Sequence, residues 1–138
     1  MSRFTYGKGV VYNISYHLIW TPKYRSHILK GRIKQIVIDA LLEKANKLEI
    51  NIEKYEVMED HVHLFIKAKP IHKISEVVRY LKGYSSYKVR EKYPKYKKYK
   101  SFWSPSYYCE TIGHISEQTI KKYIDDQMQH HMNNSSPG

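Results

Sequence analysis

Hydrophobic and polar residues alternate along four short segments of the chain, which is the pattern of a half-buried strand. These segments cover about residues 11–20, 51–58, 61–68 and 107–112. In the first of them Tyr16, Leu18 and Trp20 share one face, while Ser15 and His17 lie on the other. The pattern therefore predicts four strands that direct one face toward a core.

Elsewhere the apolar residues recur every three or four positions, which predicts helices. The first helix spans about residues 33–48, and the second runs from about 74 toward 90 and stops before Pro94. A third helix begins near Ser116, which can cap its first turn, and Glu117 there matches the helix dipole. Its stripe over residues 120–128 contains Tyr123 and Gln127.

The predicted elements follow one another as strand, helix, strand, strand, helix, strand and terminal helix. This order is typical of an α+β split-βαβ sandwich, ferredoxin-like or RRM-like, in which an antiparallel sheet carries helices on one face. Val62, Leu64 and Ile66 would face those helices. His61 and His63 would then point out from the open face, where a ligand could reach them. Residues 1–132 are expected to form a single domain, and the polar tail 133–138 is expected to be disordered.

The composition restricts the class of protein. At 138 residues the chain can bury a core without crosslinks. Its single cysteine, Cys109, excludes an intrachain disulfide framework and a cysteine-based zinc site. No segment approaches the ~18 apolar residues of a membrane span, and the N-terminus lacks the apolar region of a signal peptide. We therefore expect a soluble, cytoplasmic protein that does not associate with membranes.

The net charge of +11 indicates a negatively charged partner. Lysines and tyrosines interleave over residues 92–100, so that ammonium groups can meet phosphates while phenol rings stack on unpaired bases. A solvated loop that keeps the protein soluble is the simpler explanation of this segment alone. Because the excess charge is global and no amphipathic helix concentrates it, the composition favours nucleic acid over a membrane surface.

Two short motifs together resemble a catalytic apparatus. His61 and His63 share a face of a strand, and Tyr123 and Gln127 share a face of a helix. Two imidazoles and an amide oxygen can hold a divalent cation beside a phenol, an arrangement suited to cutting a phosphodiester through a covalent tyrosine. Each motif alone has a simpler interpretation, since exposed histidines are often only solvated and a tyrosine is often a core aromatic. Imidazole ligands favour Mn²⁺, whereas cellular abundance favours Mg²⁺.

Two further residues have alternative roles. Asp60 is either a turn residue at the start of its strand or a partner that fixes an imidazole tautomer. Gly113 either ends the fourth strand or forms a hinge that lets the last helix move as a unit.

Blocks of sequence along nearly the whole chain resemble one known family. The block at 59–64, Glu-Asp-His-Val-His-Leu, is similar to the HUH motif, in which two histidines flank a bulky apolar residue. The chain resembles the single-tyrosine HUH transposases, the TnpA type encoded by small bacterial and archaeal insertion sequences. Glu59 stands where a proline is common in that family. The other matching blocks lie at 16–25, 81–86, 103–108 and 123–127.

The resemblance implies an activity and a set of roles. Such enzymes cleave and rejoin single-stranded DNA at hairpin ends of their element through a 5′-phosphotyrosine intermediate. By this resemblance Tyr123 is the nucleophile, and His61, His63 and Gln127 are the ligands of Mg²⁺ or Mn²⁺. The resemblance also implies a homodimer in which the tyrosine helix of one chain completes the histidine site of the other. Candidate DNA contacts are Lys23, Arg25, Lys82 and Ser86.

Three rival interpretations remain open. A replication initiator or relaxase shares the HUH core, but a relaxase would need Tyr12 or Tyr16 as nucleophile, and both lie on the inward face of their strand. A domesticated transposase that acts on chromosomal repeats would share the active site. A non-catalytic RNA-binding module of the same topology would need exposed aromatic rings on its central strands, for which Phe65 is a candidate.

Overall fold

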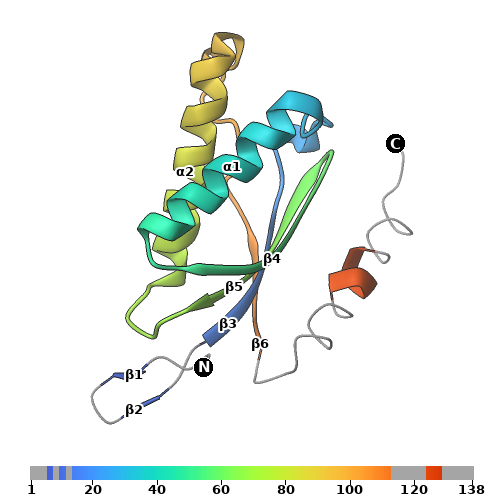
Figure 1. Ribbon diagram of the computed structural model, residues 1–138. Coiled ribbons are helices and arrows are strands. Elements are labelled where there is room, and N and C mark those ends of the chain that lie inside the picture. Colours follow the sequence, from blue (N-terminus) through green and yellow to red (C-terminus); the bar gives the residue numbers. More distant parts are fainter. Residues whose placement is uncertain (1–5, 8–9, 12–13, 113–123, 129–138) are drawn as a thin grey trace.

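The computed structural model describes residues 6–7, 10–11, 14–112 and 124–128 (Figure 1). Gly113, Ser116, Glu117, Tyr123 and the predicted tail lie outside the described residues. Within these ranges, side chains are described for residues 14–112 and 124–128.

Four strands form an antiparallel sheet in the order β4-β5-β3-β6. Their bounds are β3 (Ile14–Trp20), β4 (Asn51–Met58), β5 (His61–Ala68) and β6 (Tyr108–Ile112). The helices α1 (Gly31–Lys47) and α2 (Ile74–Lys92) connect β3 to β4 and β5 to β6. Both helices lie on the same side of the sheet (Figure 1). This is the predicted ferredoxin-like sandwich, so the fold prediction is confirmed.

The two strands β4 and β5 begin and end where the sequence pattern predicts, whereas β3 does not. β3 begins at Ile14, because residues 10–11 belong instead to β2 (Val10–Val11), which pairs with β1 (Tyr6–Gly7) in a separate small antiparallel pair. α1 begins two residues earlier than predicted, at Gly31, whose φ of +57° is a left-handed conformation that glycine adopts without strain.

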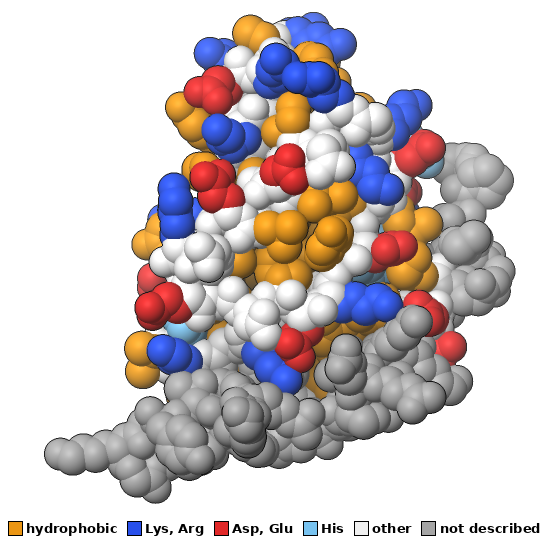
Figure 2. All heavy atoms as spheres, in the orientation of Figure 1, with side chains coloured by type: hydrophobic (Ala, Val, Ile, Leu, Met, Phe, Trp, Pro, Cys, Tyr) orange, Lys and Arg blue, Asp and Glu red, His pale blue; other side chains and the backbone are white. Residues whose placement is uncertain are grey.

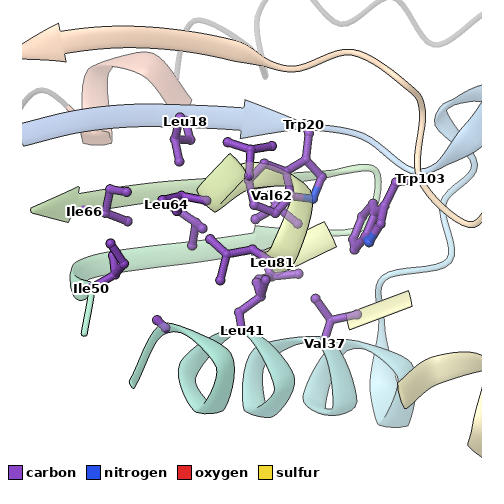
Figure 3. Packing of buried hydrophobic residues seen from close by; sticks show 14 of the residues in the cluster. Leu18, Trp20, Val37, Leu41, Ile50, Val62, Leu64, Ile66, Leu81 and Trp103 are labelled. Carbon is purple, nitrogen blue, oxygen red and sulfur yellow. The ribbon is translucent and has the colours of Figure 1, made fainter. Parts of the chain in front are cut away.

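The main core lies between the sheet and the two helices (Figure 3). Trp20 and Trp103 meet edge to face, with ring centroids 6.0 Å apart. The strand residues of this main core alternate along the chain, as the predicted inward face requires. They include Leu18, Val62, Leu64 and Ile66, and the helices contribute Val37, Leu41, Val77, Val78 and Leu81.

A second layer covers the opposite face of the sheet. The helical segment 124–128 lies there, on the side away from α1 and α2 (Figure 1). Ile124 is buried against Phe65 of β5, with Ile112 and Met128 packed around them. The prediction of an open, accessible face for the histidines is therefore wrong: His61 is 5% exposed and His63 is 1% exposed. Their side of the sheet is the predicted one, but it is covered rather than open.

The lysine- and tyrosine-rich segment also differs from its prediction. It was expected to be a loop, but it contains the short 3-10 helix η2 (Pro94–Lys98), which begins at a proline. The exposed lysines of this region gather at the end of the molecule where α2 meets η2 (Figure 2). Within the part of the chain that the structure describes, no helix is both long and apolar enough to cross a membrane.

Candidate active site

The histidine pair lies at the start of β5, one of the two central strands of the sheet. Because alternate strand residues point to the same face, His61 and His63 lie side by side, with ring centroids 4.7 Å apart. Both imidazoles are buried on the face that the segment 124–128 covers. Burial of two ionisable rings at one place is costly unless each is hydrogen-bonded, so the partners of each ring decide what the pair can do.

Asp60 holds the first of these rings. Its Oδ1 lies 2.6 Å from Nδ1 of His61, a hydrogen bond in which the ring nitrogen donates to the carboxylate. Arg25 donates to the other carboxylate oxygen, Oδ2, at 3.3 Å. Burial alone would raise the pKa of Asp60, but its hydrogen bond to His61 and its electrostatic interactions with His61, Arg25 and His27 lower that pKa overall. The carboxylate stays ionised, and it directs Nε2 of His61 away from Asp60.

His17 of β3 holds the second ring. Its Nε2 lies 3.3 Å from Nδ1 of His63, and the two rings stack with centroids 5.5 Å apart. His17 is fully buried, and the ring of Phe65 stacks on its imidazole with the two ring centroids 5.2 Å apart. The sequence places His17 on the polar face of its strand but gives no sign that it meets His63, because this contact depends on the register between β3 and β5.

The terminal helical segment brings Gln127 to the same side of the sheet. Ile124 packs on Phe65, four residues along the strand from His61, and Gln127 lies half-buried one turn further on. Tyr123 immediately precedes this segment but lies outside the described residues. In this structure the segment docks on the sheet of its own chain.

The donor set at this site fits a divalent cation. With Nδ1 of His61 facing Asp60 and Nδ1 of His63 facing His17, both rings can present Nε2 as a ligand atom. No group of three His, Cys, Asp or Glu side chains able to hold a metal occurs among the described residues. A third protein ligand from this part of the chain would be of another type, such as the amide oxygen of Gln127.

The four candidate DNA contacts lie in different surroundings. Lys82 is half-buried, and its Nζ donates to the carbonyls of Ser104 and Ser106 at 2.6 and 3.2 Å, which ties α2 to the segment before β6. Burial lowers the pKa of Lys82. Ser86 lines a shallow groove of about 450 Å³ that includes Arg90 and Lys97. DNA contact by Lys82 and Ser86 stays a prediction.

The other two candidates lie in the short 3-10 helix η1 (Lys23–Arg25), whose Arg25 reaches the residue that precedes the histidine pair. The backbone N–H of Lys23 donates to the carbonyl of Phe102 at 3.0 Å. This hydrogen bond fixes the turn against the chain just after the lysine- and tyrosine-rich segment 92–100. Arg25 has a left-handed backbone with φ of 51° and reaches Asp60 with its guanidinium. Its side chain is 58% exposed, so the ion pair leaves part of the charge accessible to solvent.

A split-βαβ sheet with a His-x-His pair on a central strand, covered by a C-terminal helical segment, is the arrangement of the HUH class. The sequence profile of the family described as "Transposase IS200 like" matches residues 10–127 of this chain. The chain belongs to this family of transposases, and the inferred resemblance is confirmed.

Individual relatives agree with this assignment. The ISDra2 transposase TnpA of Deinococcus radiodurans is 37% identical over 124 residues, covering 88% of this chain and 89% of the relative. The transposase for insertion sequence element IS200 of Salmonella typhimurium is 30% identical over 121 residues, covering 86% and 79%.

Solved structures share the fold. A crystal structure of a candidate transposase from Deinococcus radiodurans aligns with a TM-score of 0.73 and 34% identity, covering 89% of this chain and 97% of that one. The structure of a REP-associated tyrosine transposase bound to a REP hairpin aligns with a TM-score of 0.64 and covers 98% and 74%. At 15% identity this second likeness shows the fold alone.

The geometry also weakens two of the rival interpretations. A relaxase-like use of Tyr16 would require an accessible, acidic phenol, whereas Tyr16 packs against the main core and burial raises its pKa. An RNA-binding module would need Phe65 free for stacking, but Phe65 is 1% exposed beneath Ile124.

Proposed function

We propose that this transposase cleaves and rejoins single-stranded DNA at the hairpin ends of an insertion sequence through a 5′-phosphotyrosine intermediate. The observation that carries the proposal is the pair of buried, oriented imidazoles of His61 and His63, covered by a segment that starts one residue after Tyr123. The higher identity to insertion-sequence transposases favours this over a role at chromosomal repeats, since the REP-associated relative shares only the fold.

The cleavage step transfers a phosphoryl group to the protein. The phenol of Tyr123 loses its proton to solvent as its oxygen attacks the scissile phosphorus. The bond from phosphorus to the 3′ oxygen breaks, and the departing 3′ oxygen takes up a proton from solvent. The 5′ side is then bound to the tyrosine, and the free 3′-OH can later attack a second such bond to rejoin DNA. The energy of the phosphodiester is kept in the covalent bond, so neither ATP nor an external nucleophile is needed.

The chain's own residues prepare this step. His61, His63 and Gln127 would hold Mg²⁺ or Mn²⁺, which when bound polarises the scissile phosphate and offsets its developing charge. Asp60 fixes the orientation of His61, and Arg25 in turn fixes Asp60. The apolar contact between Phe65 and Ile124 would help to keep water away from the histidines on this face of the sheet. Lys23, Arg25, Lys82 and Ser86 are proposed to contact the DNA. Residues 1–132 would act as one catalytic domain, with 133–138 as a tail that takes no part in catalysis.

Binding to single-stranded hairpins should depend steeply on salt, because the net charge is +11 and many cations are exposed. For four phosphate contacts, affinity should fall about 50-fold between roughly 50 and 200 mM salt. Fluorescence anisotropy with a labelled hairpin from the DNA that flanks the reading frame measures this. Plain duplex should compete poorly, since stacking on tyrosine rings needs unpaired bases.

A matched pair of variants locates the binding surface. Replacing three exposed lysines of η2 by glutamine should lower the salt slope by about two. The same loss of charge elsewhere on the surface should change the slope much less. A flat salt response of the wild type, or equal effects of the two triple variants, would contradict DNA binding by the lysines of η2. The η2 lysines are Lys95, Lys97 and Lys98, and the control set is Lys47, Lys73 and Arg79.

We propose further that the protein acts as a homodimer whose sites are shared between chains. The strand β6 lies at the edge of the sheet and contains only one charged residue, Glu110, whereas the opposite edge strand β4 contains three. Charged side chains protect an edge strand from pairing, so β6 is the edge better suited to meet a second copy. Gly113 follows β6 directly and is the proposed hinge from which the terminal helix reaches the partner's sheet.

Mixing two inactive variants tests the shared site. One chain contains Tyr123→Phe, and the other contains His61→Leu and His63→Leu, with leucine chosen because both positions are buried. A shared-site heterodimer regains one intact composite site. The rate of hairpin cleavage per heterodimer should therefore return to up to about half of the wild-type rate per dimer. Heterodimers that demonstrably form, as shown by differently tagged chains, yet stay inactive would show that each chain builds its own site.

A further inference from the structure

The imidazole of His17 has no role in the proposed reaction, yet it is the most enclosed polar side chain beside the site. Its exposed fraction is 0%, and it lies between His63 and Phe65 on one side and Tyr108 on the other. Packing alone does not require an imidazole here, because a phenyl ring would stack on Phe65 without the cost of burying two polar nitrogens. The groups that lie near the two ring nitrogens of His17 should therefore account for an imidazole at this buried position.

The register of the sheet sets those partners. His17 of β3 is directly opposite Phe65 of β5 and directly opposite Glu110 of β6. Directly opposite residues point to the same face, so the side chain of Glu110 lies beside His17 on the histidine-bearing face. Glu110 Oε2 is 3.9 Å from Nδ1 of His17, within ion-pair range although longer than a hydrogen bond.

The carboxylate of Glu110 favours one position for the proton of His17. Its oxygen lies 3.9 Å from Nδ1, too far for a hydrogen bond, but a nearby acceptor with negative charge favours the tautomer that carries the proton on Nδ1. Nε2 of His17 is then an acceptor, and it lies 3.3 Å from Nδ1 of His63. In that tautomer His63 donates from Nδ1, and its Nε2 is the nitrogen that can act as a ligand atom. The reverse direction would put the proton on Nε2 of His63 and block that atom.

We propose that Glu110 and His17 form a positioning pair that fixes the tautomer and ring orientation of His63. The pair does for His63 what Arg25 and Asp60 do for His61. This inference rests on the proposed function, because it assigns a purpose to a ring that the proposed function treats as a metal ligand. Neither His17 nor Glu110 touches the substrate, so both act only through His63.

Substitutions at residue 17 separate orientation from packing. His17→Phe keeps the stacking on Phe65 but removes the acceptor for His63. His17→Gln places an amide oxygen near the former Nε2 and should restore the acceptor. Ser15→Ala, two residues back on the same face of β3, is the matched control. Thermal unfolding of each full-length variant identifies those that remain folded.

Two readouts follow, neither of which is cleavage. Mn²⁺ affinity, measured by electron paramagnetic resonance of the free ion, should fall about 10- to 100-fold in His17→Phe and recover largely in His17→Gln. Glu110→Gln should give a smaller, severalfold loss, because an amide can satisfy either tautomer of His17. Long-range ¹H–¹⁵N correlations of the metal-free protein should show the proton of His63 on Nδ1 in the wild type. In His17→Phe they should show a mixture of the two neutral tautomers of His63.

The outcomes distinguish the inference from the proposed function. If the wild type binds Mn²⁺ through His61 and His63, but folded His17→Phe keeps the same affinity and the same His63 tautomer, the positioning role is wrong and the metal site stands. If the wild type shows no histidine-dependent Mn²⁺ binding, the metal role itself is wrong and the positioning role falls with it. Ser15→Ala should match the wild type in both readouts, and a loss there equal to that of His17→Phe would assign the effect to general disturbance of β3.

Discussion

Tyr123→Phe should abolish the covalent protein–DNA adduct and leave hairpin binding within about twofold of the wild type. The phenol oxygen is the proposed nucleophile, and phenylalanine keeps the ring while removing the only atom that can form the phosphotyrosine bond. Incubation with a labelled single-stranded hairpin and Mn²⁺, followed by a denaturing gel, separates the adduct from free DNA. Anisotropy on the same samples measures binding, so loss of chemistry is distinguished from loss of affinity.

Tyr108→Phe is the matched control for that experiment. Tyr108 lies on the histidine-bearing face beside His17 and is half exposed, so it is the alternative nucleophile that the geometry offers. Desolvation, together with the charge of Glu110 and a hydrogen bond to it, raises the pKa of Tyr108, which makes its phenol a poorer source of phenolate. We expect Tyr108→Phe to form the adduct at the wild-type rate. An adduct that survives Tyr123→Phe and disappears in Tyr108→Phe would reassign the nucleophile.

Removing either imidazole at residues 61 and 63 should lower the cleavage rate by about 10²–10³, because Lewis-acid polarisation of a phosphate is worth several kcal/mol in the transition state. An excess of chelator should do the same to the wild type. Initial rates of adduct formation at fixed DNA and varied Mn²⁺ measure the effect. The dependence on Mn²⁺ should shift to higher concentrations or vanish in each variant.

The choice of replacement matters because both rings are buried. His63→Ala would leave a cavity and lower the free energy of unfolding by about 2–4 kcal/mol, so lost activity could reflect lost structure. His63→Leu and His61→Leu fill most of the volume, and denaturant unfolding checks that each variant folds. His27→Leu removes an exposed imidazole near Asp60 and should cleave normally. Full cleavage by the wild type in excess chelator would contradict the metal role.

The sheet and its two helices could be predicted because their signals are local. The strands β4 and β5 have the predicted bounds, since their apolar and polar residues alternate in the sequence and turn residues separate the two. The beginning of β3 could not be placed so well, because residues 10–14 continue the same alternation although the chain changes partner there. Nothing local distinguishes a strand that leaves one sheet from a strand that continues in it.

The burial of the histidine-bearing face could not be predicted from the sequence. His61 and His63 look like solvated residues when only β5 is considered, because nothing in β5 itself shows that their face of the sheet is covered by a segment sixty residues further along the chain. Phe65, a large apolar residue on the same face, was a sign that the face is covered. His17 could not be assigned a partner, since its contact with His63 requires the register of two strands that are distant in sequence.

The enclosure of the two imidazoles also has a kinetic consequence. A ligand atom or a phosphate oxygen can reach rings that are 5% and 1% exposed only after the layer around Ile124 and Phe65 moves. If the two imidazoles hold an ion as proposed, its uptake and escape would be limited by the opening of that layer rather than by diffusion to the surface. An ion that has entered would exchange slowly with solvent, so the site would keep its occupancy through brief falls in ion concentration.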